Sequence, residues 1–115
     1  MLGYSAVIFF GGTAMGLKLF VDDRREFPKG FECVRSFDEA VTFFRLFGDF
    51  EFVSLDYNLG DGLSGLDLLR WMKENGKSPA HINIHSDHSE GSRLMRKYAE
   101  ENFPGAAVTM NAAKS

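Results

Sequence analysis

Cysteine is scarce in this sequence of 115 residues, and so are proline and long apolar runs. The single cysteine, Cys33, cannot form a disulfide within the chain, which fits the reducing conditions of the cytoplasm. The apolar run at residues 6–10 follows no basic segment, and it is too short for a signal-peptide core or a membrane span. We therefore expect a cytoplasmic protein that is not held in a membrane.

Basic residues are also fewer than acidic ones. The chain has 13 lysines and arginines against 16 aspartates and glutamates, which leaves a formal net charge of −3. This balance predicts no extended basic surface for nucleic acid. The sequence also contains no HExxH, CxxC, GxSxG or P-loop pattern, so the reaction classes that depend on these motifs lose support.

Phenylalanine, in contrast, is abundant, with 12 copies, and it predicts an aromatic core. A chain of this length builds one hydrophobic core and not two. We expect a single domain at residues 15–115. Residues 1–14 are expected to be an extension or leader outside the core, with a strand or an interaction segment at residues 5–10 if they are ordered.

Short apolar strands alternate with amphipathic helices along the sequence. The expected strands are residues 17–21, 31–36, 52–55, 80–85 and 106–110. The expected helices are residues 36–47 and 64–75 and a third that starts at Ser89 or at Ser92 and ends at residue 102. This alternation predicts an α/β fold with a mostly parallel sheet. The connection between the first two strands is too short for a helical crossover, so we expect an extended loop there. No helix is expected after the last strand.

Polar side chains end three of these strands. Asp22 and Asp23 follow the first strand, Asp56 ends the central one, and His85 and Ser86 follow the fourth. Because the carboxyl ends of parallel strands meet at one edge of a sheet, we expect these side chains to line one pocket. Carboxylates gathered in this way repel one another, and Mg²⁺ suits a shell of carboxylate, carbonyl, water and phosphate oxygens.

This pattern resembles that of response-regulator receiver domains, over residues 17–110. The resemblance implies a doubly wound, flavodoxin-like fold with a five-stranded parallel sheet of order 2-1-3-4-5, lacking the first and last receiver helices. It also implies that Asp56 accepts a phosphoryl group and that Ser86 contacts a phosphoryl oxygen. The residues implied to hold Mg²⁺ are Asp22, Asp23, Asp56 and Asn58, the last through its backbone carbonyl.

The sequence departs from ordinary receivers in two ways. A receiver carries a lysine directly after the last strand, whereas Lys114 comes late in this chain. In addition, the chain has a set of residues that ordinary receivers lack and that looks more like a divergent receiver family proposed to process cyclic phosphates. These residues stand in Asp22-Asp23-x-Arg25, in Leu55-Asp56-x-x-Leu59-Gly60-Asp61, and in Ile84-His85-Ser86 followed by Gly91.

The residues also suggest roles on chemical grounds. The expected catalytic residues are Asp56, His85 and Ser86. Of these, His85 has an ordinary pKa of about 6.5, so it can exchange a proton with a leaving oxygen near neutral pH. Ser86 and Arg25 are the expected phosphate contacts, with Arg25 in place of the receiver lysine. Structural roles remain open for each of them: the acids can cap turns, His85 can be a structural histidine, and Ser86 can cap a helix.

Three functions are compatible with this sequence. The first is a metal-dependent phosphohydrolase or cyclic phosphodiesterase, acting on a phosphate-bearing small molecule or on the end of a nucleotide or RNA. The second is a signalling receiver that is phosphorylated on Asp56. The third is a degenerate receiver that serves as a binding module, which an absence of any effect of Mg²⁺ would favour. No protein partner is identified.

Overall fold

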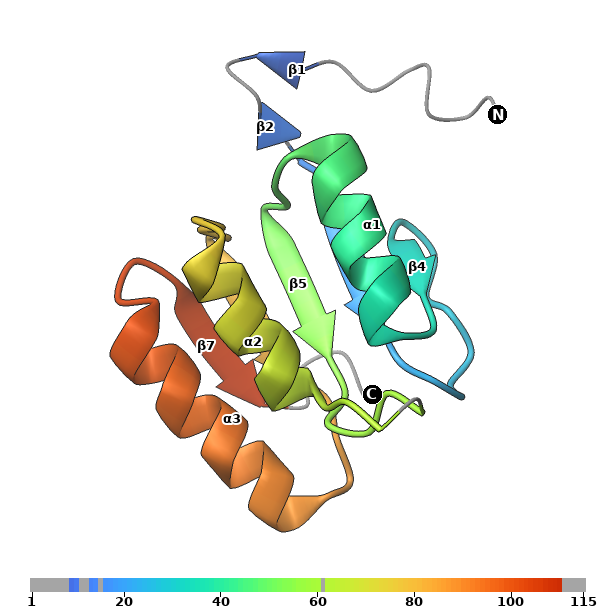
Figure 1. Cartoon of the computed structure of the whole chain (residues 1–115), viewed down its shortest axis with the longest axis vertical. Helices are drawn as coiled ribbons and strands as arrows, with labels where there is room; N and C mark the ends of the chain where they lie inside the picture. Colours follow the sequence, from blue (N-terminus) through green and yellow to red (C-terminus); the bar gives the residue numbers. More distant parts are fainter. Residues whose placement is uncertain (1–8, 11–12, 15, 61, 111–115) are drawn as a thin grey trace.

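Five parallel strands form the main sheet of the protein, in the order β4-β3-β5-β6-β7 (Figure 1). The structure, a computed structural model, describes residues 9–10, 13–14, 16–60 and 62–110. The strands are β3 (Lys18–Val21), β4 (Glu32–Val34), β5 (Phe52–Leu55), β6 (His81–Ile84) and β7 (Ala107–Met110). This is the 2-1-3-4-5 order of a flavodoxin-like sheet, and it confirms the expected fold.

Three helices connect these strands: α1 (Phe37–Phe47), α2 (Gly65–Glu74) and α3 (Ser89–Asn102). The hydroxyl of Ser36 accepts a hydrogen bond from the third residue of α1, and Ser64 forms a complete capping box with Asp67 at the start of α2. Helix α3 starts differently, because Nδ1 of His88 accepts from the N–H of Gly91 at 2.9 Å. The helix starts therefore follow the local signals, with histidine as an unusual cap.

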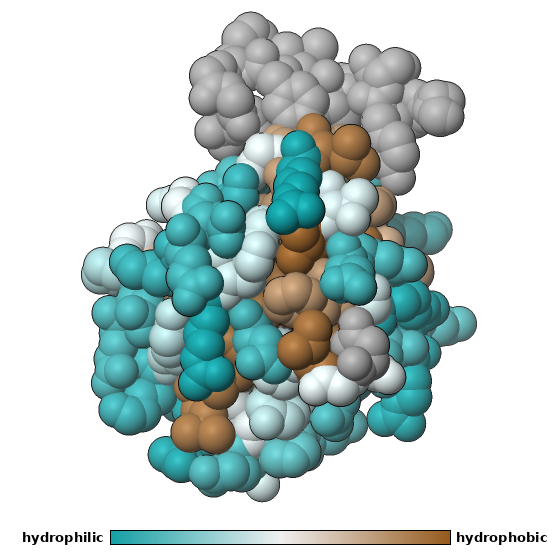
Figure 2. All heavy atoms as spheres, viewed as in Figure 1, coloured by the Kyte–Doolittle hydropathy of each residue, from teal (hydrophilic) through white to brown (hydrophobic). Residues whose placement is uncertain are grey.

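All three helices lie on one face of the sheet (Figure 1). The strands turn alternate side chains toward this face, where they are buried against the helices. The side chains that strands β3, β5 and β6 contribute are Leu19, Val21, Val53, Leu55, Ile82 and Ile84. Aromatic rings fill the space beside them, with Phe44 packed against Phe50 and Trp71. Figure 2 shows the outer side of the helix layer as mostly hydrophilic, with a narrow apolar band between the helices.

The opposite face of the sheet carries a different set of side chains. Phe20, Ser54, Asn83 and Thr109 occupy one row across strands β3, β5, β6 and β7. In the described part of the chain no helix lies on this face, because the connection from β3 to β4 is the expected extended loop. Phe27 and Phe31 of that segment pack edge-on against Phe20 instead. The polar row of this face is buried all the same: Ser54 and Asn83 are 0% exposed.

The N-terminal segment forms a small sheet of its own. Strands β1 (Phe9–Phe10) and β2 (Thr13–Ala14) pair with each other in antiparallel fashion, and they do not join the five-stranded sheet. The predicted division between residues 1–14 and the core stays a prediction, since most of that segment lies outside the described residues. Within the described residues, no helix has the length and apolar character that crossing a membrane requires.

Candidate functional site

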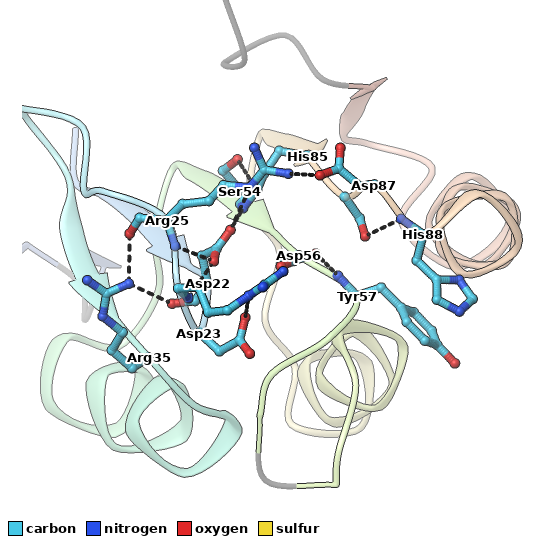
Figure 3. Close-up of polar contacts among 12 residues, drawn as sticks. Asp22, Asp23, Arg25, Arg35, Ser54, Asp56, Tyr57, His85, Asp87 and His88 are labelled. Carbon is cyan, nitrogen blue, oxygen red and sulfur yellow. Dashed lines mark hydrogen bonds and ion pairs between the residues drawn. The ribbon is translucent and has the colours of Figure 1, made fainter.

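The carboxyl edge of the sheet brings together the side chains that the sequence placed at three strand ends (Figure 3). Backbone hydrogen bonds align these ends, from the N–H of Asp56 to Val21 and from the N–H of His85 to Leu55, each at 3.0 Å. Three carboxylates converge there, those of Asp22, Asp23 and Asp56. Each offers one oxygen, and the three oxygens lie within 4.8 Å of one another.

The carboxylate of Asp22 is fully buried and already surrounded by donors. Its Oδ1 accepts from the backbone N–H groups of Arg24 and Arg25, both at 2.8 Å. Its Oδ2 lies 2.9 Å from Nε2 of His85 and 3.0 Å from Nε of Arg25. Burial raises the pKa of Asp22, but the hydrogen bonds from the two N–H groups and from His85 outweigh it and leave the pKa below its ordinary value. These four contacts use the acceptor capacity of the group, so Asp22 is held rigidly.

Asp23 differs from its neighbour because one of its oxygens has no hydrogen-bond partner among the described residues. This oxygen, Oδ1, is buried, and Nε of Arg24 lies 3.9 Å away from it. A buried carboxylate oxygen without a donor costs free energy, so native structures rarely leave one in this state. Oδ1 of Asp23 is therefore a candidate to bind a cation or to accept a hydrogen bond from a ligand.

Asp56 stands between the acidic pair and the start of α3. Its Oδ1 accepts from the N–H of Tyr57 at 2.7 Å, and the hydroxyl of Ser86 makes a side-chain hydrogen bond to it. Burial raises the pKa of Asp56, and the charge of Asp22 adds to this effect. Ser86 has a structural role as well, because its Oγ accepts from the N–H of His88 at 3.1 Å. Ser86 therefore has a structural contact near the start of α3, and its expected contact with phosphate stays a prediction.

His85 is enclosed by protein on every side. Its Nε2 faces Asp22, and its Nδ1 lies 2.7 Å from the hydroxyl of Ser54. The ring stacks on Phe20 with centroids 4.4 Å apart, and the residue is only 3% exposed. Burial holds the pKa of His85 below its ordinary value, although the hydrogen bond and the charge of Asp22 pull it upward. Both ring nitrogens thus have protein partners, Asp22 and Ser54. Direct proton transfer from His85 to a substrate stays a prediction.

Arg25 and Asn58 were expected to contact phosphate and metal. The guanidinium of Arg25 bridges Asp22 and Asp87, at 3.0 Å from each, with about a third of the side chain (34%) exposed. Asn58 lies in the exposed loop after β5, where it forms an isolated bridge with Ser64. Asp61 and Lys114 lie outside the described residues.

A cavity opens beside the acidic cluster. Its volume is about 320 Å³, and it is lined by Asp23 and by residues 57–60 and 62–64 of the loop that leads into α2. This size is at the lower end of the range for small-molecule sites. The lining includes Tyr57 and Asn58, so the cavity lies next to both Asp23 and the backbone that follows Asp56.

Some residues that shape the site were not foreseen. Arg35 donates from Nη1 to the carbonyl of Arg25 at 2.7 Å and covers the ring of Phe27, which holds the loop after β3 against the sheet. Ser54 and Asn83 lie behind His85, in the middle of buried strands. A polar residue within an apolar strand was the available signal for these two.

A family model described as the cyclic-phosphate processing receiver domain matches residues 17–101, which is most of the chain and includes every residue of the acidic cluster. No curated protein and no solved structure matches the chain significantly. The family match agrees with the five-stranded parallel sheet and with the acidic residues at its carboxyl edge. This chain belongs to the family of cyclic-phosphate processing receiver domains.

Proposed function

We propose that this domain is a Mg²⁺-dependent enzyme that hydrolyses cyclic phosphodiesters. The observation that carries the proposal is the unpartnered, buried Oδ1 of Asp23 within a cluster of three carboxylates. Such an oxygen needs a cation or a donor to offset the cost of its burial. The family to which the chain belongs supports the choice of a cyclic phosphate as the substrate class.

The donor set fits Mg²⁺ in its chemistry. The available atoms are hard oxygens, and the described residues near them include no cysteine that would favour a softer metal. Asp23 and Asp56 would hold the ion directly, together with the carbonyl of Asn58, while Asp22, whose oxygens are already engaged, would act from behind. A bound Mg²⁺ would supply neutralisation of the charge on the phosphoryl oxygens.

The residues of the chain would then carry the hydrolysis of the ring. Asp56 accepts a proton from the attacking water as the new P–O bond forms. The bond from phosphorus to one ring oxygen breaks, and the proton passes from Asp56 to this leaving oxygen. The products are a phosphomonoester and a free hydroxyl group. Ser86 would orient Asp56 and contact a phosphoryl oxygen.

A second candidate function uses the same carboxylate. Asp56 is 7% exposed, and it lies beside both a hydroxyl and the open oxygen of Asp23, as a phosphoacceptor of a signalling receiver would require. In that case Asp56 itself takes the phosphoryl group from a small donor, and the domain acts as a switch. The two functions differ in their products, since only the enzyme converts a cyclic phosphate into a monoester.

The test is ³¹P NMR of a nucleoside 2′,3′-cyclic phosphate incubated with the purified protein. We expect a growing phosphomonoester signal with Mg²⁺ and none when EDTA replaces it. A parallel sample receives a small phosphoryl donor, such as acetyl phosphate, and intact-protein mass spectrometry reads covalent labelling. An unchanged cyclic phosphate beside a labelled protein would overturn the enzyme and support the receiver switch. No reaction in either sample would overturn both.

Asp23→Asn is expected to stabilise the metal-free protein. The substitution removes one negative charge from a cluster in which the ligand oxygens lie within 4.8 Å, so folding should gain about 1 kcal/mol. The wild type should instead gain stability from Mg²⁺, about 2.7 kcal/mol at 100 times the dissociation constant. Urea denaturation with and without Mg²⁺ measures both effects. The order of stabilities should reverse between the two conditions, and equal responses of the two proteins to Mg²⁺ would refute the assignment of Asp23.

A further inference from the structure

Six polar side chains form a hydrogen-bonded chain across the face of the sheet that no described helix covers. This set, the polar chain, runs from β6 and the edge strand β7 to the acidic cluster. Its members, in order, are His81, Thr109, Asn83, Ser54, His85 and Asp22. The five contacts that link them measure 2.8, 2.6, 3.1, 2.7 and 2.9 Å. The sequence shows no sign of this connection beyond the polar residues within apolar strands.

The donor groups fix the direction of the hydrogen bonds in the first part of the polar chain, from His81 to Ser54. Thr109 donates its hydroxyl proton to Oδ1 of Asn83, so its own oxygen accepts from Nε2 of His81. The amide nitrogen of Asn83 in turn donates to Oγ of Ser54. A hydroxyl has one proton and two acceptor positions. Since Ser54 receives the proton of Asn83 on its oxygen, its own proton remains to be donated elsewhere.

The hydrogen bonds from Ser54 through His85 to Asp22 continue in the same direction. Among the described residues, the acceptor within reach of the Ser54 hydroxyl proton is Nδ1 of His85, so we infer that Nδ1 accepts and carries no proton. The ring proton is then on Nε2, which faces the carboxylate oxygen Oδ2 of Asp22 and donates to it. Every link thus points toward the acidic cluster, and only one tautomer of His85 satisfies all of them.

We propose that Ser54 is a positioning residue that acts on the acidic cluster through His85. The hydroxyl of Ser54 fixes the Nε2–H tautomer of His85, and that N–H holds the carboxylate of Asp22 in place. This inference rests on the proposed function, in which the acidic cluster holds Mg²⁺. Loss of a partner that contacts a metal ligand directly lowers metal affinity about 10- to 100-fold. Ser54 lies further back, behind His85 and Asp22, so we expect a loss at the lower end of this range, about 10-fold.

Burial and packing support the assignment. Ser54 and Asn83 are both 0% exposed, and they occupy adjacent positions of paired strands, so neither can be satisfied by solvent. Phe20 lies flat against His85, with an interplanar angle of 3°, and this stacking limits rotation of the ring. A ring held in one plane, with both nitrogens engaged, transmits the position of Ser54 to Asp22. The polar chain therefore connects the buried middle of the sheet to the acidic cluster.

The first test is ¹⁵N NMR of the imidazole groups in the metal-free wild-type protein at pH 7.5. We expect His85 to show an unprotonated, pyridine-like Nδ1 and a protonated, pyrrole-like Nε2. This measurement needs no variant and no metal. A ring with its proton on Nδ1, or one that averages between tautomers, would overturn the proposal, whether or not the protein binds Mg²⁺.

The second test compares Ser54→Ala with Ser36→Ala. The control removes a serine hydroxyl that caps α1, so it also lowers stability but leaves the polar chain intact. In Ser54→Ala we expect a shift of the Nδ1 signal of His85, shifts of the amide signals of Arg24 and Arg25, and a loss of Mg²⁺ affinity of about 10-fold.

The outcomes of this comparison separate the two proposals. Equal Mg²⁺ affinity in Ser54→Ala and wild type would overturn the positioning role. If the wild type binds no Mg²⁺, the proposed function fails, while the NMR signals of His85, Arg24 and Arg25 still decide the role of Ser54. Unchanged signals in Ser54→Ala would then overturn the inference on their own.

Discussion

Asp56→Asn is expected to lower the rate of cyclic-phosphate hydrolysis about 1,000-fold, which lies within the range for loss of a general base. The amide is nearly the same size as the carboxyl group, so the packing of β5 is preserved while the proton acceptor is lost. The hydrogen bond from the N–H of Tyr57 can still be accepted by the amide oxygen. The measurement is the initial rate of monoester formation at saturating Mg²⁺, followed by ³¹P NMR or chromatography.

Asp38→Asn is the matched control for this variant. Asp38 is exposed in the first turn of α1, and the same chemical change there should leave the rate within twofold of the wild type. Retention of more than a tenth of the wild-type rate in Asp56→Asn would contradict the role of Asp56 as the base. A similar loss in both variants would point to a general effect of charge.

Gly65→Ala is expected to destabilise the protein by about 3 kcal/mol, at the upper end of the range for overpacking a close-packed region. A β-carbon at this position would lie 2.2 Å from the backbone oxygen of Asp56 and 2.5 Å from the methyl group of Met95. The N–H of Gly65 also donates to the carbonyl of Tyr57 at 2.8 Å, so the start of α2 cannot move away without losing this bond. Urea denaturation measures the change.

The close approach of Gly65 to Asp56 also links the fold to the site. The strain should move the backbone at Asp56, so we expect Gly65→Ala to lower activity even at temperatures where it is fully folded. Gly105→Ala serves as the control, because nothing lies within 4 Å of the added β-carbon, and its stability should change by less than about 0.5 kcal/mol. Equal stability of the two variants would show that α2 does not pack against Asp56 in this way.

The fold could be predicted from the sequence because its signals are local. Residues 52–55 form a short apolar run, and the structure has a strand with those bounds. Ser36 and Gly48 mark the two ends of α1 as the sequence indicated. Strands that alternate with helices then leave few arrangements other than a parallel sheet. The start of α3 was harder to place, because its cap is the ring of His88 instead of a serine side chain.

The positions of the candidate site residues could be predicted, but their partners could not. Parallel strands bring Asp22 and Asp56 to one edge whatever the details of packing. In contrast, the pairing of Arg25 with Asp87 joins residues 62 positions apart and depends on the path of two loops. The enclosure of His85 likewise depends on Phe20 and Ser54, which lie on two other strands. Hydrogen-bond direction is a property of the assembled sheet and has no local signature.

A Mg²⁺ titration of the ¹⁵N-labelled protein, followed by two-dimensional NMR, tests most directly whether the acidic cluster binds the metal. We expect saturable shifts that are concentrated at the amides of Asp22, Asp23, Asp56, Tyr57 and Asn58, and we expect Asp23→Asn to abolish them. Such a result would place Mg²⁺ at the acidic cluster. A spectrum that does not respond to Mg²⁺, or that shifts equally in the wild type and in Asp23→Asn, would contradict the central claim.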